Sequence, residues 1–181
     1  MADCADVIVD ADASCLADTS IDNGSFDPDG DPITLSQDPP GPYSLGDTSV
    51  TLTVEDNQGA FDTCTATVTV IDNTLPEIEC NSPDTIVPPD VPISFTASAS
   101  DNCLDPSVEI MEYDCFMFTM KGKRIDKTEG CVVQIPDDTI TISDSGGVGD
   151  HITWTVTATD SSGNTTTTSC EVEVVNPGIS E

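Results

Sequence analysis

Residues 54–70 read VEDNQGAFDTCTATVTV, and residues 156–175 repeat the pattern as VTATDSSGNTTTTSCEVEVV. Each copy has an alternating polar and apolar run, a turn containing Asp and Gly, and a second alternating run with a cysteine. Alternation with period two predicts half-buried strands, and Asp with Gly predicts the turn between them. A pattern that returns after roughly a hundred residues indicates two copies of one kind of domain.

Strand-like alternation continues through the rest of the chain, and no segment has the apolar spacing of an amphipathic helix. The runs lie at residues 49–54, 65–70, 93–99, 139–143, 152–158 and 170–175. Clusters of Gly, Pro, Asn and Asp, which favour turns, separate them. We therefore predict an all-β chain of two tandem Ig-like antiparallel β-sandwiches arranged end to end.

The domain boundary is predicted in the stretch 71–78, which follows the last strand of the first copy. The predicted domains are residues 1–72 and residues 73–181. This stretch is short and contains Pro76, so the two sandwiches should form a semi-rigid rod. The second domain carries an insertion at residues 113–135 that has no counterpart in the first.

The charge is one-sided, with 34 acidic side chains, of which 25 are Asp, against four basic ones. Short Asp carboxylates in tight loops are typical oxygen ligands for Ca²⁺, so the excess of Asp over Glu favours calcium binding. The alternative is an acidic coat that keeps the protein soluble. A net charge of −30 repels phosphate, so nucleic acid is not an expected partner.

Several acidic loops should meet at one pole of each sandwich, because loops that join alternate strands lie at the same end. Carboxylate and carbonyl oxygens that converge repel each other unless a cation joins them. We therefore expect structural Ca²⁺ as a cofactor. The predicted ligands are Asp22, Asp27, Asp29, Asp31 and Asp56 in the first domain, and Asp72, Asn73, Asp101, Asn102 and Asp160 at the pole of the second.

Eight cysteines in a strand-rich chain of this size favour disulfides and an oxidising compartment. The chain has no CxxC pair and a single histidine, which argues against zinc. We therefore expect a secreted or cell-surface location. No apolar run approaches the length of about 20 residues that spans a membrane.

All four basic residues lie within seven positions of the insertion at 113–135, which we call the basic hairpin. They are Lys121, Lys123, Arg124 and Lys127. Strand-like arms flank them, and Cys115 and Cys131 lie where a disulfide could close the hairpin. Such a cationic tip could dock onto an acidic neighbour, including another copy of the chain, or it could be a solvated turn.

The frame V-x-D-x-x-G … C-x-x-x-V-x-V-x-D-x-x-x-P-x-I-x-C resembles hyalin-repeat and PKD-like bacterial Ig-like domains. The stretch VTVIDNTLPEI is similar to the cadherin inter-domain linker, in which an acidic or Asn pair binds Ca²⁺. The resemblance implies disulfides from the first strand to the last, which would join Cys4 to Cys64 and Cys80 to Cys170. This sequence departs from cadherins in having a single Asp-Asn pair in the linker, and the first domain lacks the Asp-Asn-Cys of the second.

The two remaining cysteines, Cys15 and Cys103, should lie at the poles that meet at the linker. A bond between them would clamp the junction. Eight cysteines allow 105 connectivities, so a different pairing stays open.

The predicted function is a calcium-stabilised structural or adhesive module of an extracellular or cell-surface protein, without catalysis. The stretch SDSGG at 143–147 is similar to the nucleophile motif of trypsin-like proteases, but His151 follows Ser145 by six residues, whereas that family places its histidine far upstream. Trp154 should fill a sandwich core. The alternatives are a self-assembling subunit of an extracellular filament and a carbohydrate-binding module. Expected partners are neighbouring Ig-like domains, copies of the chain itself, surface proteins or glycans.

Overall fold

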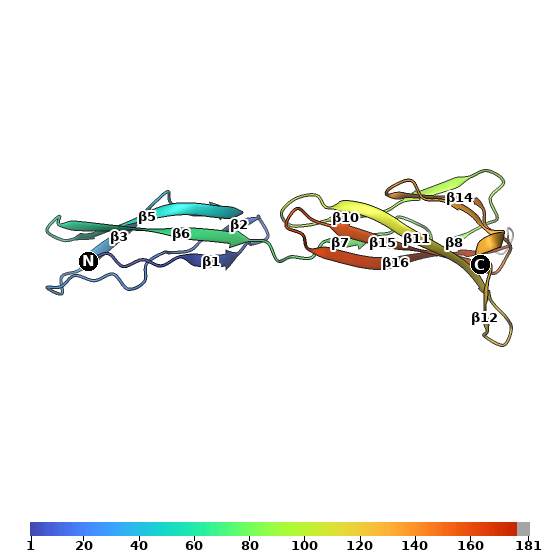
Figure 1. Ribbon diagram of the computed structural model, residues 1–181, viewed down its shortest axis with the longest axis horizontal. Coiled ribbons are helices and arrows are strands. Elements are labelled where there is room, and N and C mark those ends of the chain that lie inside the picture. The colour runs from blue at the N-terminus through green and yellow to red at the C-terminus, as the bar shows by residue number, and fades with distance from the viewer. Residues whose placement is uncertain (177–181) are drawn as a thin grey trace. The chain divides into compact units, whose positions relative to one another are not determined.

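The computed structural model describes residues 1–176, and its regular structure consists of strands with one short 3₁₀ turn. The chain divides into two compact units, Met1–Thr74 and Leu75–Glu181, whose strands are labelled in Figure 1. This boundary lies two residues after the predicted one. Residues 177–181, which we predicted as the end of the second domain, lie outside the described residues. The all-β prediction is confirmed, and the end-to-end arrangement of the two sandwiches stays a prediction.

Residues 1–74 form a four-stranded sheet in the order β1-β6-β5-β3 and a small pair of strands, β2 and β4. The long strands β5 and β6 form the first hairpin that we predicted, with Leu52 opposite Cys64. The prediction of antiparallel pairing is wrong for β1, which runs parallel to β6. The other strand pairs of this unit are antiparallel. The strands are β1 (Val7–Asp10), β2 (Leu16–Ala17), β3 (Ile33–Asp38), β4 (Tyr43–Ser44), β5 (Gly46–Asp56) and β6 (Phe61–Ile71).

The second unit builds a five-stranded sheet, β12-β11-β15-β16-β8, which is accompanied by the sheet β13-β14-β9 and the pair β10-β7. Its long hairpin β15–β16 is the second copy of the opening pattern, with Trp154 opposite Cys170. β8 runs parallel to β16. The elements are β7 (Glu77–Glu79), β8 (Thr85–Ile86), β9 (Ile93–Thr96), β10 (Ser98–Ser100), β11 (Ser107–Phe118), β12 (Arg124–Asp126), η1 (Thr128–Gly130), β13 (Val132–Gln134), β14 (Thr139–Asp144), β15 (Asp150–Thr159) and β16 (Thr165–Val174).

Each unit has its own apolar core, built from the alternate residues of its long strands. In the first unit Val50, Leu52 and Val54 of β5 and Val68 and Val70 of the neighbouring strand β6 belong to one buried cluster. In the second unit the core contains Trp154, which is 1% exposed. Trp154 stacks on Phe95 with ring centroids 6.3 Å apart. Trp154 and Tyr43 are both buried, so neither offers a face on which a sugar ring could stack.

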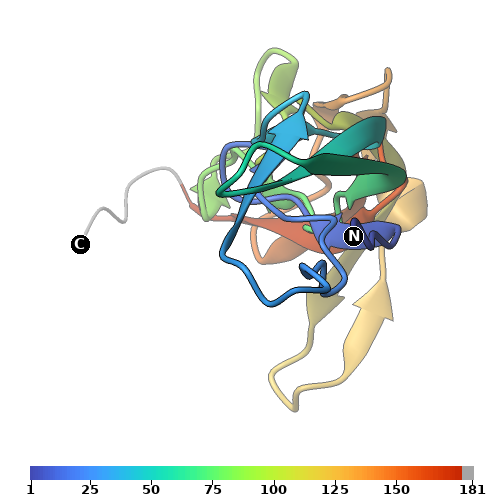
Figure 2. The same ribbon diagram turned by 90° about the vertical axis from the view of Figure 1, so that its left-hand side faces the viewer.

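The basic hairpin extends away from the body of its unit, as Figures 1 and 2 both show. It consists of the end of β11, a turn at residues 119–123, β12 and η1. β12 pairs with Phe116–Phe118 of β11 alone. The tip is therefore supported from one side only. Among residues 1–176, no helix has the length and apolar character needed to cross a membrane.

Candidate functional site

The Asp residues of the two long hairpins close their turns with identical hydrogen bonds. Asp56 Oδ1 accepts the backbone N–H groups of Gln58 and Ala60 at 2.8 and 2.9 Å. Asp160 Oδ1 accepts those of Ser162 and Asn164, both at 2.8 Å. The fourth residue of each turn is a glycine with positive φ, Gly59 or Gly163. A short carboxylate reaches these N–H groups and the longer Glu does not, which gives the Asp excess a structural cause.

Two further loops use the same geometry. Asp27 Oδ1 accepts the N–H groups of Asp29 and Asp31, and Asp12 Oδ1 accepts those of Ser14 and Leu16. In the Asp12 loop a cysteine, Cys15, occupies the position that glycine holds in the other three loops, with φ of 60°. A side chain in this region of φ is unfavourable, so the surrounding structure must hold Cys15 in place.

The predicted calcium ligands of the first unit are only partly brought together. Asp27 and Asp56 line a small cavity of about 160 Å³ together with Asp62, and Asp31 accepts a hydrogen bond from Gln58 on the Asp56 turn. Asp22 lies apart from this cavity, with Oδ1 bonded to Ser25 N–H. Within residues 1–74, no three acidic, cysteine or histidine side chains place ligand atoms within 4.8 Å of one another.

In the second unit, Asp101 and Asp160 differ in how their carboxylates are used. Asp160 is buried, and its second oxygen accepts the side-chain amide of Asn164 at 2.8 Å. Asp101 Oδ1 accepts Cys103 N–H at 3.0 Å, whereas Asp101 Oδ2 is buried and has no hydrogen-bond donor among residues 1–176. Asn102, the next predicted ligand, also buries its side-chain oxygen. Asp101 is therefore the carboxylate with the greater need for a counter-charge.

The two linker ligands, Asp72 and Asn73, are held by bonds within the first unit. Asp72 is buried, and its Oδ1 accepts Thr74 N–H at 3.0 Å. Asn73 donates from its side-chain amide to Asp10 Oδ1 at 2.8 Å. Their predicted role at the pole of the second domain stays a prediction.

Hydrogen bonds to the turn carboxylates keep several of them ionised at low pH. Burial alone would raise the pKa of Asp160, but the bonds from Asn164, Ser162 and Gly163 outweigh it and lower that pKa below its ordinary value. The pKa of Asp22 is lowered by hydrogen bonds from Ser25. The pKa of Asp62 is lowered by the N–H groups of Ala2 and Thr63. These loops therefore carry fixed negative charge across the physiological pH range.

Disulfides link the first part of each unit to its long hairpin, and a further one closes the basic hairpin. Cys4 is bonded to Cys64, Cys80 to Cys170 and Cys115 to Cys131, with Cα atoms 6.1, 5.7 and 6.5 Å apart. These are the pairs expected from the resemblance and from the hairpin. Cys15 and Cys103 are disulfide-bonded as well, and their pairing with each other stays a prediction.

The basic hairpin is anchored by Arg124. Its guanidinium forms an ion pair with Asp114 and lies 4.0 Å from the ring centre of Phe116, a cation–π arrangement. Phe116 in turn stacks on His151, whose Nδ1 lies 2.6 Å from Glu171 Oε1. Lys121, Lys123 and Lys127 form no ion pair among the described residues.

The serine-protease motif does not form an active site. Ser145 is 1% exposed, so a substrate could not reach its hydroxyl. The neighbouring Asp150 is also buried and accepts Gly147 N–H at 2.9 Å. His151 forms a hydrogen bond with Glu171 through Nδ1. Residues 143–144 end β14, and the Gly-rich residues 145–149 form the connection to β15.

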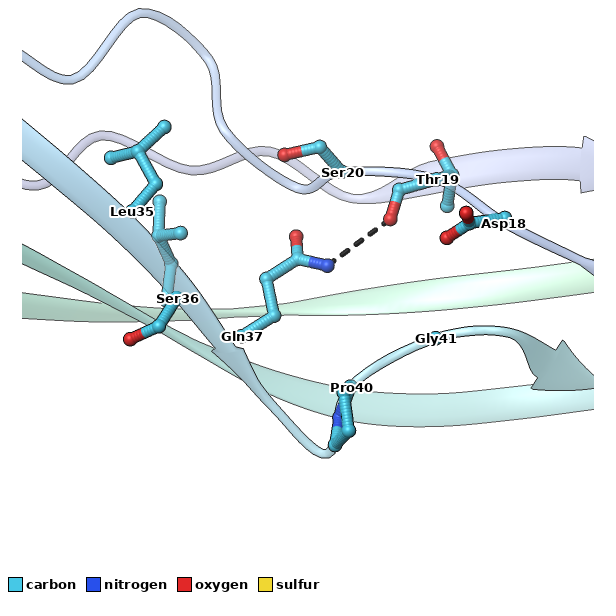
Figure 3. Close-up of a pocket in the computed structure, with 9 residues that line it drawn as sticks. Asp18, Thr19, Ser20, Leu35, Ser36, Gln37, Pro40 and Gly41 are labelled. Carbon is cyan, nitrogen blue, oxygen red and sulfur yellow. Dashed lines mark hydrogen bonds between the residues drawn. The ribbon is translucent and has the colours of Figure 1, made fainter.

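Sequence reasoning missed an open groove of about 530 Å³ in the first unit, which we call the β3 groove (Figure 3). It lies between β3 and the segment 18–20. Gln37 of β3 joins its two sides: Gln37 Oε1 accepts Ile21 N–H at 2.7 Å, and Gln37 Nε2 donates to the Thr19 carbonyl at 3.1 Å. Its walls and floor include Asp18, Leu35, Gln37, Pro40, Gly41 and Leu52.

Gly41 and Tyr43 lie near Asp18 at one side of the groove. A Cβ on Gly41 would lie 2.6 Å from Asp18 Oδ1, so a larger residue there would displace the Asp18 carboxylate. Burial and the charge of Asp18 together raise the pKa of the nearby Tyr43 hydroxyl. That hydroxyl donates to the Pro39 carbonyl and accepts from Gln37 Nε2. The only hint in the sequence was an Asp, a Gln and a Gly-Pro turn in separate segments.

No protein-family model matches this chain, and no curated protein matches it. Solved structures with a related fold include fibronectin(III)-like modules of Clostridium thermocellum CbhA, with 15% identity and a TM-score of 0.36 over 82% of this chain and 80% of that one. The extracellular cadherin domains 1–4 of protocadherin gamma B7 give 15% identity and 0.40 over 93% and 47%. Domains 1–5 of protocadherin gamma B2 give 10% identity and 0.42 over 96% and 38%. The chain spans less than half of these protocadherin chains, and TM-scores below 0.5 identify neither a family nor a function.

Proposed function

We propose that the chain is a calcium-stabilised structural or adhesive segment of an extracellular protein and that it performs no catalysis. The disulfides within both units support an oxidising compartment. Each unit is a small sandwich with few core residues, for which disulfides and bound ions are the common means of added stability. Binding of Ca²⁺ to the folded form would stabilise it by mass action.

The observation that carries the calcium proposal is the buried, donor-free oxygen Asp101 Oδ2. A buried carboxylate oxygen costs free energy unless a hydrogen-bond donor or a cation approaches it. Ca²⁺ accepts six to eight oxygens from carboxylates, Asn side chains, backbone carbonyls and water. Asp101 with Asn102 supplies ligand types that suit this ion. Asp56 and Asp160 already give one oxygen each to two backbone N–H groups, so they rank below Asp101 as ligands.

The test is thermal unfolding of the oxidised protein in EDTA, in millimolar Ca²⁺ and in millimolar Mg²⁺, with an ion count by native mass spectrometry. We expect a Ca²⁺-selective rise in Tm and at least one retained ion. Asp101→Asn keeps the acceptor for Cys103 N–H but removes the charge, and should abolish most of the rise.

The matched control is Asp105→Asn, an exposed Asp in the same loop, which should keep the full response. An unchanged Tm together with no retained ion would remove Ca²⁺ from the proposal. An equal loss in both variants would place the ion elsewhere. The extracellular assignment has its own readout, the absence of free thiols in protein isolated from its source.

A further inference from the structure

The tip of the basic hairpin combines exposed apolar and cationic side chains. Met120 is fully exposed, and Phe118 and Ile125 are 50% and 40% exposed. Lys121 lies next to Met120 at the turn, and Lys123 follows. Ile125 pairs with Met117 and Phe118 with Arg124, so Phe118 and Ile125 point to opposite faces of the hairpin. The apolar side chain at the turn itself is Met120, and it stands beside two lysines that can contact a partner with it.

Hydrogen bonds within the turn and a disulfide at its base brace this tip. Thr119 N–H donates to the Lys123 carbonyl at 2.9 Å, and Lys123 N–H donates to Thr119 Oγ1 at 3.0 Å. Gly122 has φ of 74°, so the turn has the same form as the Asp-x-x-Gly loops. The Cys115–Cys131 bond and the Arg124–Asp114 ion pair fix the base. Little conformational freedom would be lost when such a tip binds.

The charge of the tip indicates what kind of partner it fits. The lysines at 121, 123 and 127 have no ion pair among residues 1–176, although the chain carries 34 acidic side chains. A cationic patch is attracted locally to a carboxylate, and a second copy of this chain has 34 acidic side chains to offer. This local attraction acts against the overall repulsion between two chains that each carry a net charge of −30.

The β3 groove has the complementary chemistry. Asp18 is exposed at one side, and Leu35, at the other, is 42% exposed and offers an apolar contact. Its volume of about 530 Å³ falls in the range of pockets that bind ligands. β3 is also an edge strand, paired with β5 on one side only, and unpaired strand edges accept extended backbone.

We propose that the hairpin tip of one copy docks into the β3 groove of a second copy, with Met120 against Leu35 and with Lys121 beside Asp18. The two surfaces lie on different units of the chain, so the contact is heterologous and each copy keeps one free tip and one free groove. Contacts of this kind form open chains unless they close into a ring. The proposal goes beyond calcium binding and does not depend on it.

The contact is small, because one turn meets one groove. An interface below about 1,200 Å² is typical of weak or transient association. We therefore expect association that becomes visible only at high concentration.

The test is sedimentation velocity of the full chain from about 10 μM to about 1 mM, the range in which weak contacts become populated. We expect the weight-average sedimentation coefficient to rise with concentration. Lys121→Glu and Asp18→Lys should each remain monomeric. An equimolar mixture of the two should associate again, because every tip then meets a groove of opposite charge.

Two variants with the same charge changes at other places serve as controls. Lys127→Glu lies at the base of the hairpin, and Asp29→Lys lies outside the groove. Both should associate like the wild type. Circular dichroism and Tm check that every variant is folded. A wild type that stays monomeric over the whole range overturns the proposal. So does a loss in the controls as large as that in Lys121→Glu and Asp18→Lys, or a mixture that stays monomeric.

Discussion

Asp56 and Asp160, which lie in different units, each use one carboxylate oxygen to accept the backbone N–H groups two and four residues ahead. The repeated pattern of the sequence thus encodes a repeated turn as well as a repeated pair of strands. We interpret the Asp at these positions first as a turn residue. Any role in ion binding must use the second carboxylate oxygen, Oδ2.

Replacing Asp56 by Ala should therefore destabilise the first unit even in EDTA. Two backbone N–H groups lose their acceptor, which costs about 1–2 kcal/mol. Asp56→Asn keeps a side-chain oxygen at the same place and should lose much less. Chemical denaturation in EDTA measures both. Asp29→Ala is the control, because its carboxylate accepts no hydrogen bond among residues 1–176. Equal losses in the Ala and Asn variants would contradict the turn role and indicate a role for charge.

The acid sensitivity of the second unit should decrease in Asp160→Asn. Hydrogen bonds hold the pKa of Asp160 in the folded state below its ordinary value of 3.8. A carboxyl group with a lowered folded pKa contributes stability above its unfolded pKa, and that contribution disappears as the pH falls through the folded pKa.

The measurement is Tm against pH, from about pH 7 to about pH 2, for wild type and Asp160→Asn. Lower pH also relieves the repulsion within a chain of net charge −30, so the difference between the two proteins is the informative quantity. That difference should be constant above about pH 4 and should shrink below it. Parallel curves down to the lowest pH would be inconsistent with a lowered pKa at Asp160.

Gln37→Ala should strongly destabilise the first unit. The side chain accepts Ile21 N–H and donates to the Thr19 carbonyl and the Tyr43 hydroxyl. Its loss leaves these partly buried groups unsatisfied, at a cost of about 2–3 kcal/mol. Gln58→Ala, which removes one exposed hydrogen bond to Asp31, should change stability by less than about 0.5 kcal/mol. Similar unfolding midpoints for the two variants would show that Gln37 does not hold the groove together.

The pairing of Cys15 with Cys103 can be decided by peptide mapping without reduction. Cleavage before aspartate releases residues 12–17 and residues 101–104, and each of these peptides contains a single cysteine. We expect the two peptides to appear as one cross-linked mass that separates on reduction. Either peptide attached to a fragment carrying another cysteine would disprove the pairing.

The fold was predictable wherever one residue in two faces the core. The hairpins β5–β6 and β15–β16 are predicted by long runs of alternating polar and apolar residues on either side of a turn with Asp and Gly. Short strands such as β2 and β4 have two residues each, too few to show a period. The parallel pairing of β1 with β6 also escaped prediction, because it depends on where the chain re-enters the sheet and leaves no local signal.

The candidate sites were less predictable, and the reason is specific. The sequence shows that Asp occurs at positions such as 27, 56 and 160, but the atoms that each carboxylate meets depend on the turn that it closes. The spacing Asp-x-x-Gly carried that information, since it is the signature of a side chain that bonds its own loop. The β3 groove gave no such signal, because Asp18, Gln37 and Gly41 come together only through tertiary packing.

Because all four basic residues lie at positions 121–127, the chain should resist proteases that cut after Lys or Arg everywhere except at this hairpin. Proteases that cut after Lys or Arg find their targets on the projecting hairpin and nowhere else in the sequence. Every one of these peptide bonds lies between Cys115 and Cys131, which are joined to each other. A molecule nicked there keeps both fragments covalently linked, with its cores untouched, and loses only the integrity of the tip.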